Sequence, residues 1–325
     1  MYYKQAFDAK KRWWLYLIGI AVFFIGWQSV GMLPLGIAIG LAGPTASQLQ
    51  EFSDIAKIAA FLGGNLFMLM MLLTFVLGLF SLWVFVKTAH KRKFTSLISI
   101  GKVNYRKILF SFLSTSVYHG AFLLIGYLLS PELFEWSFNP ETFWYVLIMA
   151  VLVLPFQTSC EEIVFRGYLM QSIGVLLRYK WVAILLTSIG FGLLHSMNPE
   201  VEVIGWSSMI FYIGFGLFMA IITTMDDGLE LAIGFHWATN FFGIAIVSSN
   251  WGTAQTDTLI TDLSEPGAGA SWMYISTGAL VLMYLLFALV YKWKSPKKLF
   301  EKVELPDPVE REMVIEDDLE LNYRP

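Results

Sequence analysis

Charged residues are scarce in this chain, and their scarcity excludes a water-soluble globule. Of 325 residues only 14% are charged and 57% are hydrophobic, and the mean hydropathy is +0.62. An ordinary soluble domain has about 25% charged residues and somewhat under half apolar ones. Most of the surface of this chain must therefore face a solvent other than water, and we expect a membrane protein.

The chain also has almost no cysteine and no excess of basic over acidic residues. One cysteine excludes a disulfide framework and a thiolate zinc knuckle. A formal net charge of −3 offers phosphates no basic face, so nucleic-acid binding is not expected. Aromatic residues, by contrast, make up 16% of the chain and include 12 Trp, which are favoured at membrane–water interfaces. The composition predicts an all-α, polytopic bundle of membrane helices.

Apolar runs long enough to cross a bilayer recur along the chain. A helix rises about 1.5 Å per residue, so about 20 apolar residues cover a hydrocarbon core of about 30 Å. The clearest runs are Trp13–Leu33, Ile58–Val86, Ile108–Leu129, Trp181–Met197, Val203–Met225, Leu231–Ser249 and Trp272–Tyr291. Another begins near Thr142 and continues beyond the acidic pair Glu161–Glu162. We therefore expect about eight transmembrane helices, the first of them too long for a cleaved signal peptide.

Basic residues gather in the loops of one side and predict the orientation of the chain. All of the 22 Lys and Arg except Lys57 and Arg166 precede span one, join spans two and three or four and five, or follow span eight. The loops of the opposite side carry mostly Asp and Glu. Cytoplasmic loops are enriched in Lys and Arg, so we expect a multi-pass protein of the cell membrane with both termini in the cytoplasm.

The spans and loops divide the chain into regions. These are an N-terminal transmembrane region of three spans over 1–141 with an interfacial segment near 94–107, spans four to seven over 142–250, an extracytoplasmic loop and span eight over 251–291, and a charged cytoplasmic tail over 292–325. The tail after Lys298 is charged and interrupted by proline, so we expect it to be largely disordered.

Three charged residues stand inside a predicted span, where a charge costs from about 2.5 to more than 10 kcal/mol. They are Glu161, Glu162 and Arg166, in SCEEIVFRGYL. Residues i and i+4 share a helix face, so we expect Arg166 to neutralise Glu162. Glu161 then faces another direction without a local partner, and a desolvated carboxylate of this kind suits general-base chemistry. The alternative is that the charged pair only locks helix packing.

Span four and span five are expected to form a hairpin. Pro155 should kink the helix that carries the acidic pair. If Thr142–Leu177 is one long kinked helix, the chain turns at Arg178 and returns as the next span. Positions 161 and 195 are equally far from that turn. Glu161 and His195 are therefore expected at the same depth on neighbouring helices.

A third polar element lies in span seven. His236 and Asn240, in HWATN, are four residues apart and share one helix face. His236 follows the cytoplasmic turn by about 8–10 residues, or about 12–15 Å. The helix of Glu161 must then protrude several ångströms toward the cytosol for the depths to agree. A lone intramembrane His is often only a packing residue, but two His, a Glu and an Asn at similar depth indicate a catalytic site.

These elements match the motifs of a known family in order and spacing. The matching residues are Glu161-Glu162-x-x-x-Arg166, Phe191-x-x-x-His195 and His236-x-x-x-Asn240. The pattern resembles the CPBP (Abi) family of CAAX-processing and bacteriocin-processing intramembrane proteases, which includes the type II CAAX prenyl endopeptidases. The resemblance covers about Leu152 to Ile246, somewhat under a third of the chain.

The resemblance implies a bundle of membrane helices around a catalytic cavity open to the cytosol, with 142–250 as the catalytic core. The roles that it implies are water activation by Glu161 and His195, oxyanion stabilisation by His236 and Asn240, and support of the cavity by Glu162 and Arg166, with Phe191 in packing. Amide hydrolysis needs such a base and such hydrogen-bond donors.

No cofactor is expected. Zinc is the alternative, because Glu and His can bind it, but the chain has no HExxH pair and the two histidines stand on separate spans. We therefore favour a metal-free glutamate mechanism. The expected partners are a peptide or membrane-protein substrate and the lipid bilayer, and the sequence leaves the oligomeric state open.

Two other functions compete with that of an endopeptidase. One is a non-proteolytic membrane scaffold, such as a bacteriocin-immunity or regulatory protein that keeps the motifs for structure. The other is a transporter with Glu161 in a proton relay, which the lack of an inverted repeat disfavours. Cys160 is expected to act as a small hydrophobe rather than as a nucleophile. His119 is expected to pack or to hydrogen-bond a neighbouring helix.

Overall fold

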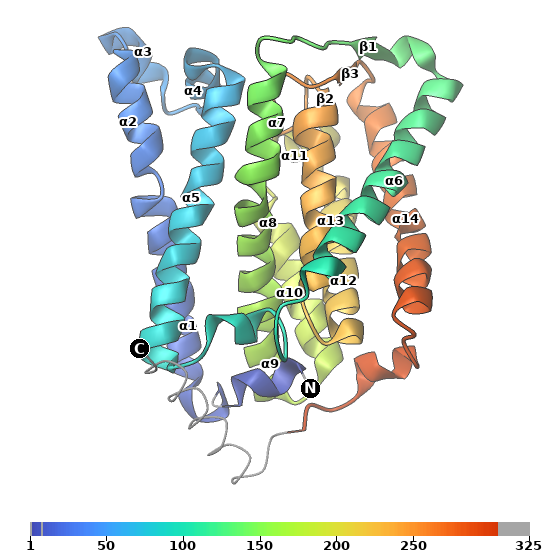
Figure 1. Ribbon diagram of the computed structural model, residues 1–325. Helices are drawn as coiled ribbons and strands as arrows, with labels where there is room; N and C mark the ends of the chain where they lie inside the picture. The colour runs from blue at the N-terminus through green and yellow to red at the C-terminus, as the bar shows by residue number, and fades with distance from the viewer. Residues whose placement is uncertain (1, 8, 305–325) are drawn as a thin grey trace.

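The computed structural model describes residues 2–7 and 9–304 and confirms a polytopic helical bundle (Figure 1). Its α-helices are α1 (Ala9–Ile25), α2 (Leu33–Ala42), α3 (Ala46–Glu51), α4 (Ile55–Leu62), α5 (Gly64–Phe85), α6 (Tyr105–Leu129), α7 (Phe143–Leu152), α8 (Leu154–Glu162), α9 (Met170–Leu177), α10 (Lys180–Leu194), α11 (Pro199–Ile204), α12 (Met209–Asp226), α13 (Glu230–Phe241) and α14 (Pro266–Val290). Its strands are β1 (Phe134–Trp136), β2 (Val247–Ser249) and β3 (Ile260–Asp262). The 3₁₀ helices named below are η1 (Tyr2–Ala6), η4 (Phe94–Leu97) and η9 (Pro296–Phe300), and the π-helical segments are η6 (Ile163–Leu169) and η8 (Phe242–Ile246).

Six helices of the described part of the chain are long and apolar enough to cross a membrane. They are Arg12–Ala42, Gly64–His90, Tyr105–Leu129, Phe143–Leu177, Trp206–Asp226 and Pro266–Val290. The predicted spans Trp181–Met197 and Leu231–Ser249 correspond to shorter helices, α10 and α13 with η8. The protein is therefore a multi-pass membrane protein, and the count of eight spans stays a prediction.

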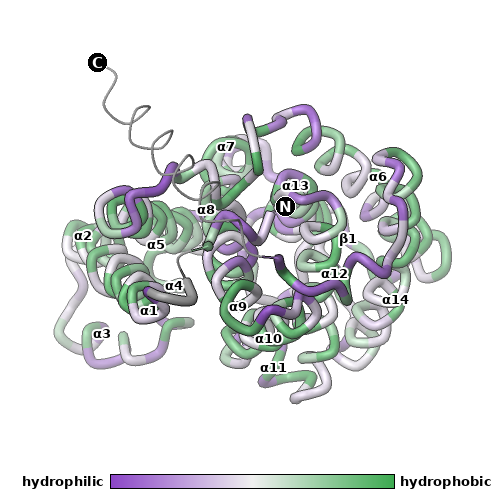
Figure 2. Tube along the Cα trace, turned by 90° about the horizontal axis from the view of Figure 1, so that it is seen from below, coloured by the Kyte–Doolittle hydropathy of each residue, from purple (hydrophilic) through white to green (hydrophobic). Residues whose placement is uncertain are grey.

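The helices form two groups. In the view along the bundle, α1 to α5 lie on one side, and α6 to α14 form a rounder group beside them (Figure 2). Helix α5 contacts α8, and α1 contacts α9, so the long helix of span four joins the two groups. Large apolar side chains such as Leu17, Leu128 and Leu289 are exposed on the outside, as a lipid-facing surface requires.

The long kinked helix and the hairpin are both as the sequence predicts. The segments α7, α8, η6 and α9 follow one another over Phe143–Leu177, and the α-helix is interrupted at Val153, two residues before Pro155. Arg178 then takes the left-handed conformation (φ 67°), and α10 returns beside the long helix. This hairpin brings the first two motifs together.

A small sheet closes the end of the bundle opposite the N-terminus (Figure 1). Strand β3 pairs antiparallel with β1, with Phe134 opposite Asp262, and parallel with β2, with Val247 opposite Ile260. The sheet joins the loop after α6 to the loop after α13. The all-α prediction thus holds for the bundle. In these loops, part of the backbone N–H and C=O groups form their hydrogen bonds by strand pairing instead.

The other end of the bundle is closed by η1. Tyr2 and Tyr3 are buried, and the phenol of Tyr2 donates to the carbonyl oxygens of Leu97 and, at 3.3 Å, of Arg166. Burial raises the pKa of both tyrosines, so both phenols keep their protons near neutral pH. Leu97, within the segment expected to lie at the interface, is itself fully buried beneath the long helix.

The first part of the tail packs onto the hairpin turn. The amide of Val303 donates to the carbonyl of Arg178 at 2.9 Å, and Arg178 Nε donates to the carbonyl of Val303 at 2.8 Å. Lys180, which is buried, pairs with Glu301 at 2.7 Å. The expected disorder after Lys298 is therefore wrong for these residues, because they complete a backbone pairing. Residues 305–325 of the tail lie outside the described residues.

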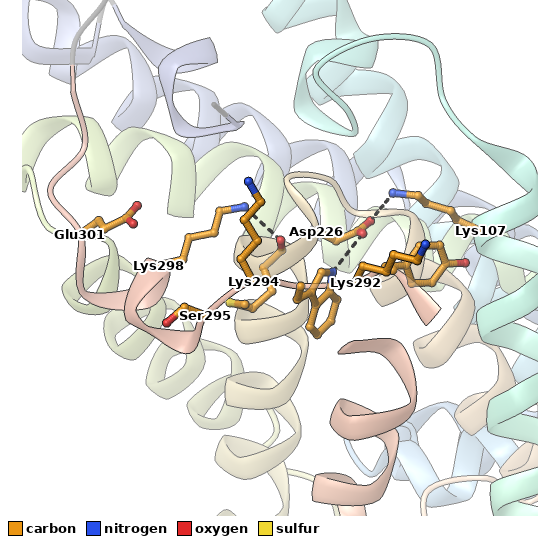
Figure 3. A pocket seen from close by; sticks show the side chains of 10 residues that line it. Lys107, Asp226, Lys292, Lys294, Ser295, Lys298 and Glu301 are labelled. Carbon is orange, nitrogen blue, oxygen red and sulfur yellow. Dashed lines mark hydrogen bonds and ion pairs between the residues drawn. The ribbon is translucent and has the colours of Figure 1, made fainter. Parts of the chain in front are cut away.

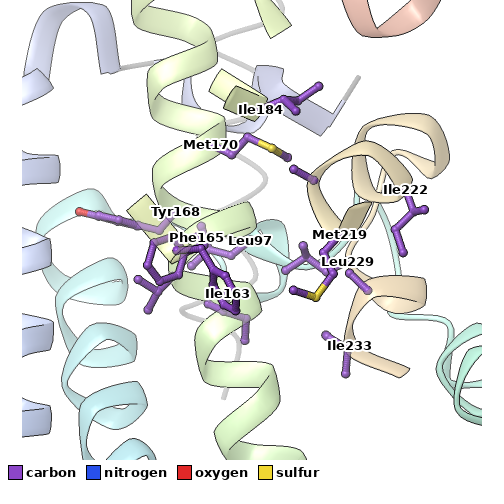
Figure 4. Packing of buried hydrophobic residues seen from close by; sticks show 14 of the residues in the cluster. Leu97, Ile163, Phe165, Tyr168, Met170, Ile184, Met219, Ile222, Leu229 and Ile233 are labelled. Atoms are coloured by element: carbon purple, nitrogen blue, oxygen red, sulfur yellow. The ribbon is translucent and has the colours of Figure 1, made fainter. Parts of the chain in front are cut away.

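The main core lies between η6 and the helices α12 and α13 (Figure 4). Ile163 and Tyr168 of the long helix are buried, as are Met219 of α12 and Leu229 at the start of α13. Lipid tails are as apolar as these side chains, so close van der Waals packing, and not exclusion from water, holds such helices together.

Helix α13 lies unusually close to α6. A Cβ atom at Gly234 would stand 2.2 Å from the carbonyl oxygen of Ile108, so only glycine fits there. Ser111 also donates to the carbonyl of Leu231 at 2.6 Å. Small residues permit such approaches between membrane helices. The contact fixes the helix that carries the third motif.

Candidate active site

The predicted ion pair between Glu162 and Arg166 is confirmed. Arg166 Nη1 lies 3.1 Å from Glu162 Oε1, and both side chains are fully buried. Arg166 Nη2 also donates to the carbonyl of Gly216 at 3.0 Å. The pair therefore joins the long helix to α12 while neutralising a charge that could not stand alone in the bundle.

His236 lies between the two glutamates. Its Nδ1 is 2.8 Å from Glu162 Oε1, and its Nε2 is 3.6 Å from Glu161 Oε2. A carboxylate accepts hydrogen bonds, so Nδ1 carries a proton that it donates to Glu162. This bond fixes the tautomer and turns Nε2 of the buried ring toward Glu161.

Gln157 connects the first motif to the third, and sequence reasoning missed it. Its Nε2 donates to Glu161 Oε1 at 2.6 Å, and its Oε1 accepts from Asn240 Nδ2 at 3.2 Å. The expectation that Glu161 has no local partner is therefore wrong. The available signal was the spacing, because Gln157 is a polar residue four positions before Glu161 on the same helix.

The two glutamates differ in access. The side chain of Glu161 is 13% exposed, whereas that of Glu162 is fully buried. Oε2 of each glutamate is buried and accepts no hydrogen bond from the described residues, so the exposed fraction is what distinguishes the two side chains. Glu161 is thus the more accessible of the two carboxylates.

His195 stands beside this group at the end of α10. Its Nδ1 donates to the carbonyl of Phe191 at 2.8 Å, which leaves Nε2 as an acceptor. Its ring stacks on that of Tyr212, with the centroids 4.7 Å apart. The phenol of Tyr212 accepts a hydrogen bond from the amide of Asn198 and donates one to the carboxylate of Glu200. These supporting residues were not expected from the sequence.

No hydrogen bond or ion pair within residues 2–7 and 9–304 joins His195 to Glu161. The ring of Phe191 contacts both histidines, with its centroid 4.6 Å from that of His195 and 6.1 Å from that of His236. Of the two histidines, His236 is the one that lies within 4 Å of the Glu161 carboxylate, at 3.6 Å. The shared role of Glu161 and His195 in activating water stays a prediction.

Glu161 and His236 lie at the same depth in the bundle because the long helix extends past the start of α13. His236 is six residues from the start of α13, or about 9 Å along the helix, whereas Glu161 is sixteen residues from the end of α9, or about 24 Å. Since the two side chains are 3.6 Å apart, the long helix extends about 15 Å beyond the start of α13. The sequence predicts an extension in this direction, but one of only several ångströms.

Both site helices change to π-helix at the site. Segment η6 begins directly after Glu162, and η8 begins two residues after Asn240. π-Helical turns are rare and occur frequently at functional sites. Sequence periodicity gave no sign of them.

His119 and Cys160 lie as the sequence predicts. His119 is 2.9 Å from Thr239 Oγ1, next to Asn240 on α13, and Cys160 is a buried free thiol. Across the part of the chain that the structure describes, no three His, Cys, Asp or Glu side chains converge to hold a metal ion.

Known proteins are similar to the part of the chain that carries this site. A family model described as "Type II CAAX prenyl endopeptidase Rce1-like" matches residues 140–242, which include all six predicted site residues. "Uncharacterized protein YyaK" of Bacillus subtilis (strain 168) is 31% identical over 232 residues, which is 70% of this chain and 77% of that protein. The chain belongs to the CPBP family. No solved structure matches it.

Membership of the CPBP family implies an intramembrane protease of the CAAX type that acts on a peptide substrate. The buried pair Glu162–Arg166 and the adjacent Glu161 lie within the residues that the family model matches.

The buried pair gives a test of stability. We expect Arg166→Met to lower the free energy of unfolding by about 3–5 kcal/mol, because it leaves the Glu162 carboxylate buried without its guanidinium partner. The double variant Glu162→Leu, Arg166→Met removes both charges and should lose clearly less. Unfolding of the purified protein in mixed micelles measures both values. Equal losses in the single and double variants would show that the pair is not the stabilising feature.

Proposed function

We propose that the protein is an intramembrane endopeptidase that hydrolyses a peptide bond with a water activated by Glu161. The observation that carries this proposal is the 3.6 Å separation of Glu161 Oε2 and His236 Nε2. That distance is too long for a direct hydrogen bond but lets one oxygen atom contact both groups. A carboxylate and an imidazole that face one reacting oxygen are the parts that amide hydrolysis requires.

In this proposal His195 assists the base. In the neutral ring, the Nδ1–H bond to the Phe191 carbonyl leaves Nε2 as the nitrogen that can accept a proton. Stacking on Tyr212 restricts the ring. The water would donate one proton to Glu161 or His195. That side chain would then pass the proton to the leaving amine as the carbon–nitrogen bond breaks.

His236 and Asn240 are proposed to stabilise the oxyanion. Glu162 orients the ring of His236, and Gln157 holds the amide of Asn240. To act on an oxyanion, His236 must donate from Nε2 as well as from Nδ1, which both nitrogens do in the doubly protonated ring. The preorganised donors then meet the negative charge as it develops, without reorganisation.

The site is proposed to open toward the cytosol. His236 lies about 9 Å from the start of α13, near the end of the bundle where the predicted orientation places the cytoplasm. A peptide could enter from that end without crossing the whole bilayer. The proposed mechanism needs no metal ion.

The glutamate carries the first test. We expect Glu161→Gln, which keeps the size of the side chain, to lower cleavage by a factor of about 10² to 10⁴, and His195→Ala to lower it as well. The measurement is the membrane-peptide profile of cells that express each variant. Cys160→Ala, at the adjacent buried position, is the matched control and should leave the profile unchanged.

Two outcomes would contradict this assignment. Equal cleavage by the wild type and both variants would exclude the peptidase mechanism. If cells that express the variants keep the wild-type phenotype although no cleavage occurs in them, a membrane scaffold would be favoured.

Gln157 gives a second test. We expect Gln157→Leu to lower kcat about 10- to 100-fold with little change in KM, because Glu161 and Asn240 both lose their orienting partner. Ser159→Ala on the same helix is the control and should retain wild-type kcat. The assay uses the purified protein and a substrate identified from the peptide profiles. Wild-type kcat in Gln157→Leu would show that the bridge has no part in catalysis.

Metal removal gives a third test. We expect the purified protein to keep its activity after treatment with 1,10-phenanthroline or EDTA, because the proposed base and donors are all side chains. Loss of activity that added zinc restores would instead favour the zinc mechanism.

A further inference from the structure

A cavity of about 550 Å³ opens at the lysine-rich end of the bundle (Figure 3). It lies between the end of α12, the first turn of α6 and the segment that follows α14. One membrane-crossing helix begins at Tyr105, one ends at Asp226 and one ends at Val290, all beside this cavity. The cavity therefore lies at the level where helices leave the hydrocarbon and meet the lipid headgroups.

The two acidic residues that line this cavity already have cationic partners, in the pairs Lys107–Asp226 at 2.7 Å and Lys180–Glu301 at 2.7 Å. Lys298, which also lines the cavity, pairs with Asp227 at 2.6 Å. Lys292 and Lys294 also line the cavity, are exposed, and make no hydrogen bond or ion pair with the residues that the structure describes. Two uncompensated positive charges therefore face one cavity.

We propose that this cavity binds the phosphate of an anionic phospholipid headgroup, with Lys292 and Lys294 as the cations that meet it. The predicted orientation places it in the cytoplasmic leaflet. Basic pockets between membrane helices on that side are suited to anionic headgroups.

The surroundings favour a lipid over a free phosphate ion. Tyr291 and Trp293, both at the cavity, are of the residue types that lie at the headgroup level of membranes. Below them, the framing helices expose Leu109 of α6 and Leu285 and Leu289 of α14. These side chains offer a surface to acyl chains, which a free phosphate would not use.

Lipid binding to the purified full-length protein tests this proposal. The probes are dihexanoyl-phosphatidylglycerol, dihexanoyl-phosphatidylcholine and inorganic phosphate, each titrated in a non-ionic detergent and followed by native mass spectrometry. We expect the wild type to prefer the phosphatidylglycerol. In Lys292→Asn, Lys294→Gln its Kd should rise about thirtyfold, as removal of two lysines at a membrane surface predicts.

The variants are chosen to keep the backbone intact. Lys292 has a φ of 52°, and Asn tolerates this left-handed conformation. The matched control is Lys91→Asn, Lys102→Gln, which removes two exposed lysines of the same end that lie outside the cavity, with Lys91 also left-handed (φ 53°). The control should retain the wild-type Kd.

Three results would overturn the proposal. Equal weakening in the pocket variant and the control would assign binding to diffuse surface charge. Equal binding of phosphatidylcholine and phosphatidylglycerol would exclude recognition of an anionic headgroup. Inorganic phosphate that binds as tightly as the lipid and is lost in the same variant would make the site one for a free anion. None of these results depends on peptidase activity.

Discussion

The buried carboxylate of Glu162 is the constraint on which the rest of the site depends. It is fully buried and accepts from Arg166 and from His236 through the same oxygen. A buried charge without partners would cost several kcal/mol, so the helices that supply those partners must stay where they are. Through Arg166 the contact reaches Gly216 on α12, and through His236 it reaches α13. One carboxylate thus determines how three elements meet.

Adjacent glutamates obtain different properties from this arrangement. Glu162 is held by a guanidinium and an imidazole and is fully buried, whereas Glu161 is held by the neutral amide of Gln157 and its side chain is 13% exposed. Environments that separate two acids of the same type are a recurring way to assign different roles to them. Glu162 orients the ring of His236, and in the proposed mechanism Glu161 activates the water.

The sequence predicted much of this site because its signals are strong in a membrane. Few charges occur in the spans, so Glu161, Glu162 and Arg166 stood out, and the i to i+4 rule paired the correct two. The symmetry of the hairpin about Arg178 placed the motifs on neighbouring helices. Each of these predictions needs only helical geometry.

What the sequence did not predict depends on contacts between helices. Gln157 is an ordinary polar residue until α13 brings Asn240 beside it. The π-helical segments η6 and η8 change the direction of side chains without changing the apolar pattern that a sequence shows. The packing of Val303 onto the hairpin turn comes from backbone groups, which no side-chain pattern reports.

The position of the site along the bundle follows from the chemistry proposed for it. Every backbone amide of a membrane helix is bonded within the helix, so an amide that is to be hydrolysed must first leave the helical conformation. Its free N–H and C=O groups then need polar partners, which the hydrocarbon does not supply. Near the end of the bundle, His236 is only about 9 Å from the start of α13, and Glu161, His195 and Asn240 add further polar groups. A site placed there lets a substrate unwind where water and these side chains replace the bonds that its helix loses.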